Sequence, residues 1–214
     1  MEKIDILEKL GKKEIKAEDI AKNVTKDPSL LSEIFNGISS KNSKIKFKSA
    51  KTLRVISEKN PEILYSEMDF FVNLLDSENK ILKWNAIDVI GNLTSIDSKN
   101  KFDKIFKKYY SFLSTESMVT VAHVVDNSGK IAKAKPHLTQ KITSELLKIE
   151  KTPTKPHLTQ ECKNILLGKA ILAFGTYFNQ IENKDNVISF VKRQLNNTRN
   201  ATKVKAEKFL KTID

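Results

Sequence analysis

The spacing of His123, Asp126 and Asn127 is the pattern in this sequence most suggestive of chemistry. These residues lie three and four positions apart, so one face of a helix would carry all three side chains. An imidazole and a carboxylate can both bind a metal ion, but a metal site needs further ligands. Those ligands are normally oriented by hydrogen bonds to other groups. The other histidines, His137 and His157, fall in predicted loops that nothing joins to this helix. We therefore interpret the group as a polar helix surface, keep His123 as part of a candidate binding surface, and predict no metal site.

Trp84 and Asp88 form a second suggestive pair, one turn apart on another predicted helix. An aromatic ring beside a carboxylate can receive a nucleotide base, because every base has a face that stacks. Packing between neighbouring helices is the simpler use of a single tryptophan. The sequence leaves both interpretations open, and both residues belong to the candidate binding surface.

Lysines give the chain its densest one-signed helix face. Around residues 45–56 an apolar stripe of Ala50, Leu53 and Ile56 is opposed and flanked by basic residues, namely Lys44, Lys46, Lys48, Lys51, Arg54 and Lys59. The last predicted helix repeats the arrangement. Either face could bind an acidic partner or phosphate, or simply keep the surface solvated. The basic residues assigned to the candidate binding surface are Lys44, Lys48, Lys51, Arg54, Lys203 and Lys208.

The formal net charge of +12 is distributed in blocks along the chain. Residues 41–60 carry seven basic side chains and one acidic one, whereas residues 61–98 carry two basic and seven acidic ones. A groove for a nucleic-acid backbone needs a continuous basic stripe, which this acidic block would interrupt. Only three of the 38 basic side chains are arginines, whose planar fork suits phosphate and guanine. The charge therefore favours an acidic protein partner over a long nucleic acid.

The hexapeptide Lys-Pro-His-Leu-Thr-Gln occurs twice, at residues 135–140 and 155–160. Each copy is a suitable helix start, because proline is tolerated in the first helical turn. We interpret the copies as a local duplication or a shared way to begin a helix. The alternative is a pair of matched imidazoles, His137 and His157, flanking a loop at 151–156.

Composition and motifs disfavour several protein classes. No Ser-His-Asp set, metal-ligand spacing or glycine-rich phosphate loop is present, so we predict no enzyme, no cofactor and no small-molecule substrate. The single cysteine, Cys162, excludes an internal disulfide, and its apolar neighbours predict a small core residue. The N-terminus has no apolar signal segment, and the longest apolar run, 165–178, is too short to cross a bilayer. We expect a cytoplasmic protein without membrane contact.

A repeated spacing predicts the elements that position these residues. Segments 45–56, 81–93 and 118–131 carry the same apolar pattern, and Ala50, Ala86 and Ala122 within them lie 36 residues apart each time. Such a period is typical of helical repeat proteins, in which each helix pair buries its apolar face on its neighbours. We predict a single domain over 1–214, with a helical cap in 1–26 and about five helix pairs in 27–214.

The second pair shows the pattern most clearly. Asn60 and Pro61 are expected to open a helix whose apolar stripe runs on to Leu75, and a polar turn at 76–79 leads into a second helix. On that second helix Ile81, Ala86, Val89, Ile90 and Leu93 are expected to face inward.

Residues 74–93 of this pair resemble a HEAT repeat. Paired leucines end the first helix, Asp76 and small polar residues form the turn, and Ala86 follows five positions after an aliphatic residue, ahead of an aliphatic-glycine pair. Residues 170–175 repeat the Ala-to-Gly half of the pattern, and armadillo repeats are the neighbouring family. The resemblance implies an all-α, right-handed α-α superhelix, a HEAT/armadillo-like solenoid. It also implies a scaffold that mediates protein–protein interaction through the second helices of its pairs.

The Trp84–Asp88 pair also resembles the DNA alkylation repair glycosylases, which are built from HEAT-like repeats and use aromatic and acidic residues on a concave face. Two residues are all that match, and the next unit has no arginine at the equivalent place. We therefore predict a non-enzymatic scaffold for an acidic protein partner. Sequence-independent nucleic-acid binding through the lysine faces is the alternative, and a glycosylase-like activity is the remote one.

Overall fold

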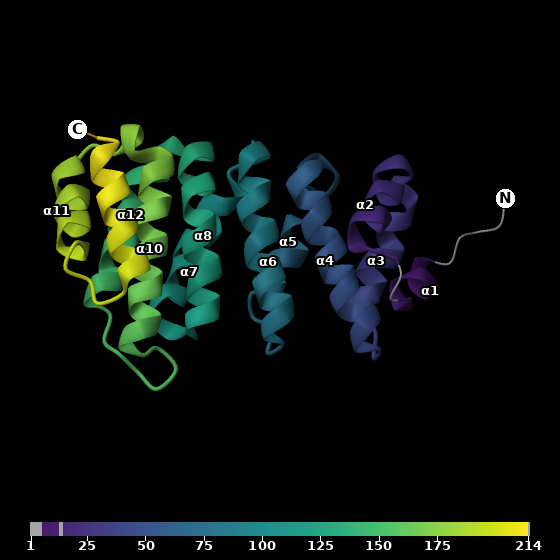
Figure 1. The fold of residues 1–214 in the computed structure, drawn as a ribbon. Helices are drawn as coiled ribbons and strands as arrows, with labels where there is room; N and C mark the ends of the chain where they lie inside the picture. Colours follow the sequence, from purple (N-terminus) through teal and green to yellow (C-terminus); the bar gives the residue numbers. More distant parts are fainter. Residues whose placement is uncertain (1–5, 13–14, 214) are drawn as a thin grey trace. The chain divides into compact units, whose positions relative to one another are not determined.

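The computed structural model describes residues 6–12 and 15–213, and the regular elements in these ranges are helical. Twelve α-helices and six short 3-10 turns follow one another along the described chain (Figure 1), which confirms the all-α prediction. The same ranges contain no β-strand beyond an isolated bridge between Lys155 and Leu158. No helix within them is both long and apolar enough to span a bilayer. The helices group into two compact units, Met1–Lys101 and Phe102–Asp214, here called unit 1 and unit 2.

Unit 1 is built around α4, which packs on α3 and lies between α2 and α6 (Figure 1). Helix α5 packs on α6. The predicted cap in residues 1–26 includes the short helices α1 and α2, while residues 1–5, 13 and 14 lie outside the described part of the chain. The helices of this unit are α1 (Ile6–Gly11), α2 (Ala17–Lys26), α3 (Leu31–Ile38), α4 (Ser43–Lys59), α5 (Met68–Leu74) and α6 (Lys80–Leu93).

Unit 2 is built around α10, which lies between α8 and α12 (Figure 1). Helix α9 contacts both α8 and α10, and α11 packs on α12. A non-helical loop at residues 152–159 separates α9 and its 3-10 extension from α10, close to the loop expected at 151–156. The helices are α7 (Lys101–Thr115), α8 (Met118–Ala134), α9 (Thr139–Leu147), α10 (Gln160–Tyr177), α11 (Lys184–Gln194) and α12 (Asn200–Lys211).

Proline opens three of the helix pairs through a 3-10 turn. Pro28, Pro61 and Pro136 are each the first residue of such a turn, in η1 (Pro28–Leu30), η2 (Pro61–Ile63) and η4 (Pro136–Leu138). Proline suits this place because it has no N–H to leave unpaired and its φ is already close to the helical value. The X-Pro signals of the sequence therefore locate the starts of these pairs correctly.

The continuous helix expected from Asn60 to Leu75 is wrong. The chain leaves the helical path after η2, and α5 begins only at Met68. In the intervening bend the hydroxyl of Tyr65 donates a hydrogen bond to the carboxylate of Asp97 at 2.6 Å. This contact joins residues 32 positions apart, so it cannot be predicted from the local apolar periodicity.

The periodic alanines are buried on the second helices of the pairs. In unit 1, Ala50 and Ala86 are 3% and 0% exposed. In unit 2, Ala122 is 9% exposed, and Ala170 and Ala206 are both 0% exposed. Ala170 and Ala206 continue the 36-residue spacing, and the longer step before Ala170 accommodates the loop at 152–159. Small side chains at these positions allow neighbouring helices to pack closely.

One inward-facing residue of α6 differs from the prediction. Ile81 is 39% exposed, and Leu82 is buried in its place. The side chain of Asn79 caps α6 by accepting hydrogen bonds from the backbone N–H groups of Ile81 and Leu82 at 3.1 and 3.3 Å. This cap fixes where the helix starts, and a step of one residue turns the side chain by about 100°, so Leu82 faces the core.

Two glycines mark close approaches of α10 to its neighbours in unit 2. A Cβ at Gly129 on α8 would lie 2.3 Å from Oγ1 of Thr176, and one at Gly168 on α10 would lie 2.8 Å from Oγ1 of Thr202. The Thr202 hydroxyl donates to the backbone carbonyl of Asn164 at 2.8 Å, so it cannot turn away without losing that bond. The short distances between these helices also bring their polar side chains within reach of one another.

Candidate interaction surfaces

Two ion pairs join neighbouring helices across unit 1. Lys51 on α4 pairs with Glu18 on α2 at 3.1 Å, and Arg54 on α4 pairs with Asp88 on α6 at 3.2 Å. The first pair is open to solvent, with side chains 49% and 40% exposed. The second is more enclosed, at 33% for Arg54 and 15% for Asp88. Solvent and salt screen an exposed pair more strongly, so Arg54–Asp88 is the stronger link.

The pKa of the Glu18 carboxyl lies below its ordinary value. The largest cause is a hydrogen bond from the backbone of Glu18 itself, at the start of α2, and the next is the ammonium group of Lys51. Both interactions favour the charged carboxylate. Lys51 is therefore already engaged with an acidic group inside unit 1.

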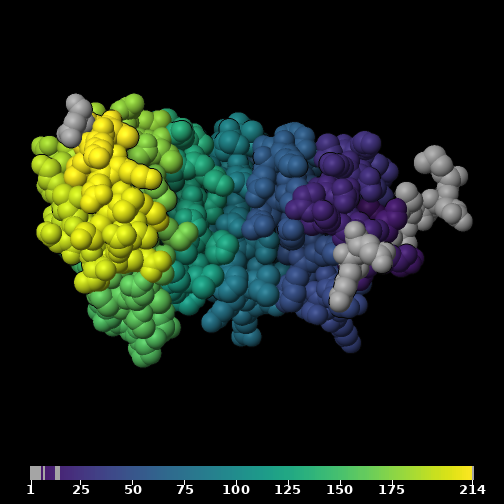
Figure 2. All heavy atoms as spheres, in the orientation of Figure 1, coloured from purple at the N-terminus to yellow at the C-terminus, as the bar shows by residue number. Residues whose placement is uncertain are grey.

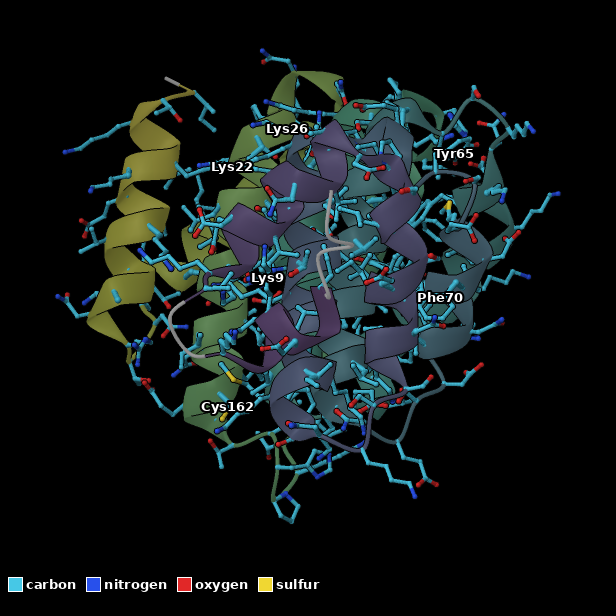
Figure 3. All side chains as sticks on the ribbon, turned by 90° about the vertical axis from the view of Figure 1, so that its right-hand side faces the viewer. Lys9, Lys22, Lys26, Tyr65, Phe70 and Cys162 are labelled. Atoms are coloured by element: carbon cyan, nitrogen blue, oxygen red, sulfur yellow. The ribbon has the colours of Figure 1, made fainter. Side chains whose placement is uncertain are left out.

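The remaining α4 lysines of the candidate surface differ in availability. Lys48 donates a hydrogen bond to the backbone carbonyl of Lys12, which follows α1, whereas Lys44 in the first turn is exposed. Figure 3 shows further lysines of this unit on α2, where Lys22 and Lys26 project from the helix, away from the side that carries Tyr65 and Phe70. The densest basic face of the sequence thus connects α4 to α1, α2 and α6, and Lys44 is the member most open to a partner.

Ion pairs also join neighbouring helices across unit 2. Lys169 on α10 pairs with Asp126 on α8 at 2.6 Å. Arg199, which directly precedes α12, pairs with Glu161 in the first turn of α10. Each pair links α10 to one neighbour, as the two pairs of unit 1 link α4 to its neighbours. In each unit, therefore, ion pairs link the adjacent helices of one layer: α2, α4 and α6 in unit 1, and α8, α10 and α12 in unit 2.

Lys205 lies close to these two ion pairs of unit 2 and takes part in neither of them. Its ammonium group lies 3.4 Å from the position of a Cβ at Gly168, so it extends over α10, and no carboxylate in the described chain forms an ion pair with it. Partial burial lowers the pKa of Lys205, and the nearby charges of Lys169 and Arg199 lower it further, against an opposing effect of Asp126. The local environment thus contains three cations and two carboxylates, and it would gain from another negative charge.

The predicted lysines Lys203 and Lys208 lie on the same helix as Lys205. Lys203 is half-buried, and Lys208 is exposed in the last turn together with Lys211. In Figure 2 the side chains of α12, in yellow, cover a broad part of the surface of unit 2 that faces the viewer. The basic face expected on the last helix is therefore open to solvent.

Trp84 and Asp88 do not form an open base-binding pair. Trp84 is half-buried on α6, and the carboxylate of Asp88 is bound by Arg54. Because that carboxylate is held toward α4 by Arg54, it is already engaged and does not serve as an open acidic neighbour of the tryptophan.

His123, Asp126 and Asn127 lie on α8 but are directed to different uses. Asn127 is buried and donates to the backbone carbonyl of His123 at 2.8 Å, while Asp126 binds Lys169. His123 is half-buried. Among the residues that the structure describes, no group of three or more His, Cys, Asp or Glu side chains is placed to hold a metal ion.

The two copies of the hexapeptide form the same backbone turn, but their lysine and histidine side chains have different surroundings. In each copy the N–H of the leucine donates to the carbonyl of the lysine, at 2.9 Å for Leu138 and 2.8 Å for Leu158. The first copy is packed, with its lysine buried and Nε2 of His137 2.5 Å from a carboxylate oxygen of Asp103. His157 in the second copy is exposed. The repeat therefore encodes a Lys-Pro-His-Leu turn, and its two imidazoles have unlike surroundings.

Sequence reasoning missed several features of these surfaces. The acidic partners Glu18 and Glu161 were not assigned a role, and neither was Lys205, although it lies between two lysines that were. Leu172 on α10 was expected within an apolar run, yet it is 54% exposed. Cys162 is half-buried in the first turn of α10 and not a full core residue. The only sequence signal for Lys205 was the excess of basic residues near the C-terminus.

Comparisons with known proteins identify a fold and no family. No family model matches the sequence, and no curated protein matches it either. The structure is similar to the crystal structure of an engineered protein from the Northeast Structural Genomics Consortium, with a TM-score of 0.57 and 15% sequence identity. The similarity covers 100% of this chain and 97% of that one. At this identity the likeness concerns the fold alone.

Proposed function

We propose that this chain is a non-enzymatic interaction module, in which HEAT-like helix pairs form one right-handed superhelical domain that binds a protein partner of acidic character. Buried alanines at a 36-residue spacing within each unit support the array of helix pairs. The shared plan of α2–α4–α6 and α8–α10–α12, each a layer of helices in contact, also supports it. In such an array the polar sides of these helices form the surface that meets a partner.

One observation carries the choice of partner: the cations on the α10–α12 face outnumber the carboxylates available to them. Lys169 and Arg199 are paired internally, and Lys205 remains. Exposed Lys208 and Lys211 add positive charge on the same helix. A complementary acidic surface would be attracted to this face and would bind in a defined register.

The placement of the carboxylates favours a protein over a nucleic acid. Asp88, Asp126 and Glu161 each lie on a helix that neighbours the cation they bind, so positive and negative groups alternate across each face. A phosphate backbone needs an uninterrupted basic track, and these carboxylates would repel it. A protein surface can match alternating charges with its own acidic and basic residues.

The test is a pull-down from lysate of the source organism at about 50 and 200 mM salt, with and without nuclease, combined with fluorescence anisotropy on generic single- and double-stranded oligonucleotides. We expect the captured proteins to be acidic and their capture to survive nuclease treatment and the higher salt. Capture that disappears with nuclease, or micromolar oligonucleotide binding at the higher salt, would overturn the proposal in favour of nucleic-acid binding. A Lys203/Lys205/Lys208→Glu variant should lose the partner, and a Lys44/Lys48/Lys51→Glu variant should retain more of it.

A further inference from the structure

The two copies of the Lys-Pro-His-Leu-Thr-Gln hexapeptide both contact α7, one at each of its ends. In the first copy, Nε2 of His137 lies 2.5 Å from one carboxylate oxygen of Asp103 in the first turn of α7, and the ammonium group of Lys135 lies 3.8 Å from the other. In the second copy, the ammonium group of Lys155 donates a hydrogen bond to the backbone carbonyl of Ser114, in the last turn of α7, at 3.2 Å. The duplicated sequence therefore supplies a contact for each end of one helix.

Between these two contacts a groove separates α7 from α9. Helix α9 packs closely on α8 and α10 but not on α7. A cavity of about 520 Å³ and a second of about 260 Å³ are each lined by both helices, and they adjoin because they share Phe106, Lys107 and Glu145. Asp103 lines the first cavity and Ser114 lines the second. The groove therefore follows α7 from near its start to near its end, a distance of about 16 Å or three helical turns.

Apolar side chains form the walls of this groove. Phe106, Tyr110 and Leu113 lie at steps of four and three residues on α7, and the ring centres of Phe106 and Tyr110 are 4.7 Å apart. On the opposite side, Leu138 lines the larger cavity and Ile149 lines the smaller one. Phe106 is half-buried and the other four residues are buried, so Phe106 is the wall residue most accessible to a ligand. A ligand that fits these walls must present apolar side chains.

The charged residues on the rim leave an excess of positive charge. The two carboxylates that line the groove already have partners, since Asp103 is bound by the first hexapeptide copy and Glu145 pairs with Lys148 at 2.7 Å. Lys107 and Lys141 are exposed, and no carboxylate in the described part of the chain forms an ion pair with either of them. A ligand with carboxylates next to its apolar side chains would complement this rim.

We propose that the groove between α7 and α9 binds a short acidic amphipathic helix of a partner protein, and that the two hexapeptide copies hold α7 in place for it. The partner helix inserts an apolar side chain into each cavity and places carboxylates beside Lys107 and Lys141. Positions i, i+4 and i+7 of a helix lie on one side and span about 10 Å, which fits within the length of the groove, with i+4 against Phe106. The inference goes beyond the proposed function, which rests on the α10–α12 face, because it gives unit 2 a second binding site.

The test is selection of displayed helical peptides on the full chain. A library of alanine- and glutamine-based helices of about 18 residues, randomised at about eight adjacent positions, is selected on the wild-type protein, and Kd for the most enriched peptide is measured by fluorescence anisotropy. We expect apolar residues at i and i+7, with Asp or Glu at neighbouring positions. Ser144→Trp fills the larger cavity from an exposed position, and Lys107/Lys141→Glu reverses the charge of the rim. Each variant should weaken binding about tenfold or more.

Matched controls place the same kinds of substitution elsewhere in unit 2. Ser189→Trp changes an exposed serine of α11, and Lys133/Lys192→Glu changes two exposed lysines that line neither cavity. Each control should change Kd less than about twofold. Because the substituted residues are exposed, Tm should stay close to the wild-type value, and if one groove variant is destabilised the other still decides the result.

The contact of the first hexapeptide copy with α7 has a test of its own. His137→Ala should speed up hydrogen exchange of the backbone amides in the first two turns of α7 and weaken peptide binding, because the start of that helix loses a contact. His157→Ala, at the exposed histidine of the second copy, is the matched control and should change neither. Equal exchange in the two variants would show that His137 does not hold α7.

Three results would overturn the groove or its occupant. The groove is wrong if no helical peptide is enriched, or if the enriched peptide binds both groove variants as tightly as the wild type. It is also wrong if an acidic peptide loses binding only to Lys203/Lys205/Lys208→Glu, a result that would support the proposed function. Peptides that are blocked by Ser144→Trp but contain no acidic residue would overturn the acidic partner for this groove and leave the α10–α12 face untouched.

Discussion

The α4 face of unit 1 and the α10 face of unit 2 are built from the same kinds of residue, yet they leave different groups for a partner. On α4, Lys51, Arg54 and Lys48 are bound to Glu18, Asp88 and a backbone carbonyl. On α10 and α12 two ion pairs also form, but a third cation and an exposed leucine remain. Lys44 also remains exposed on α4, so each face keeps a cation outside these ion pairs, and the exposed leucine is what the α10 face has in addition. The pairing of the charges, as well as their number, therefore decides what each face presents to a partner.

The largest expected effect comes from a change in the spacing between α8 and α10, on which the α10 face depends. Gly129→Ala would place a methyl group 2.3 Å from Oγ1 of Thr176, and the resulting shift of α8 from α10 should cost about 1–3 kcal/mol of unfolding free energy. Urea unfolding followed by circular dichroism measures the loss. Gly175→Ala is the matched control, since its methyl group would meet only ordinary contacts and alanine favours a helix. Equal effects of the two substitutions would show that α8 and α10 are not in close contact at Gly129.

The second effect concerns the unequal ion pairs of unit 1. Asp88→Ala removes the nearer of the two carboxylates that pair with the Arg54 guanidinium, which is only 33% exposed, and should cost about 1–2 kcal/mol of unfolding free energy. Glu18→Ala removes the partner of an open lysine, so its cost should be smaller. Chemical unfolding at low and high salt gives both values. The reverse order would contradict the assignment of Arg54–Asp88 as the main link between α4 and α6.

A smaller effect distinguishes the paired from the unpaired cation of unit 2. The lowered pKa of Lys205 means that its protonated form is less favourable in the folded protein, and this cost fades as the pH rises toward the ordinary lysine pKa. Lys205→Met should therefore leave Tm at neutral pH and low salt unchanged or slightly raised. Lys169→Met should lower Tm, because Asp126 loses its partner. A clear drop in Tm for Lys205→Met would show that this lysine has a stabilising partner.

The smallest effect is a shift in a single titration. In a Lys51→Met variant the pKa of Glu18 should rise but stay below its ordinary value, because the larger cause, the backbone hydrogen bond at the start of α2, remains. Glu18 stabilises the fold above its ordinary pKa, and that contribution is lost as the pH falls through the lowered pKa. The substitution should therefore narrow the pH range between these two pKa values. Carboxyl carbon shifts measured by NMR against pH report the value. No change would mean that Lys51 and Glu18 do not interact in solution.

Most of the secondary structure was predictable from local signals. Apolar residues at three- and four-residue steps, the X-Pro starts and the polar turns placed the helix pairs close to where the structure has them, because each signal acts within a few residues. The failures arose where distant residues intervene. Tyr65 reaches Asp97 and interrupts the helix expected before α5, and the cap by Asn79 exchanges Ile81 for Leu82.

The candidate site was predictable only in part, because a sequence gives the number of charges and not their partners. Periodicity assigned Lys203 and Lys208 to the outer face of α12, and in the structure Lys203 is half-buried and Lys208 is exposed. It could not pair Lys51 with Glu18 or Arg199 with Glu161, since these contacts span more than 30 residues. The sequence by itself determined the all-helical fold, the buried alanine positions and the overall positive charge. The tertiary structure alone decided which cations are neutralised and which remain, because an ion pair depends on helices far apart in the chain being packed within a few ångströms of each other.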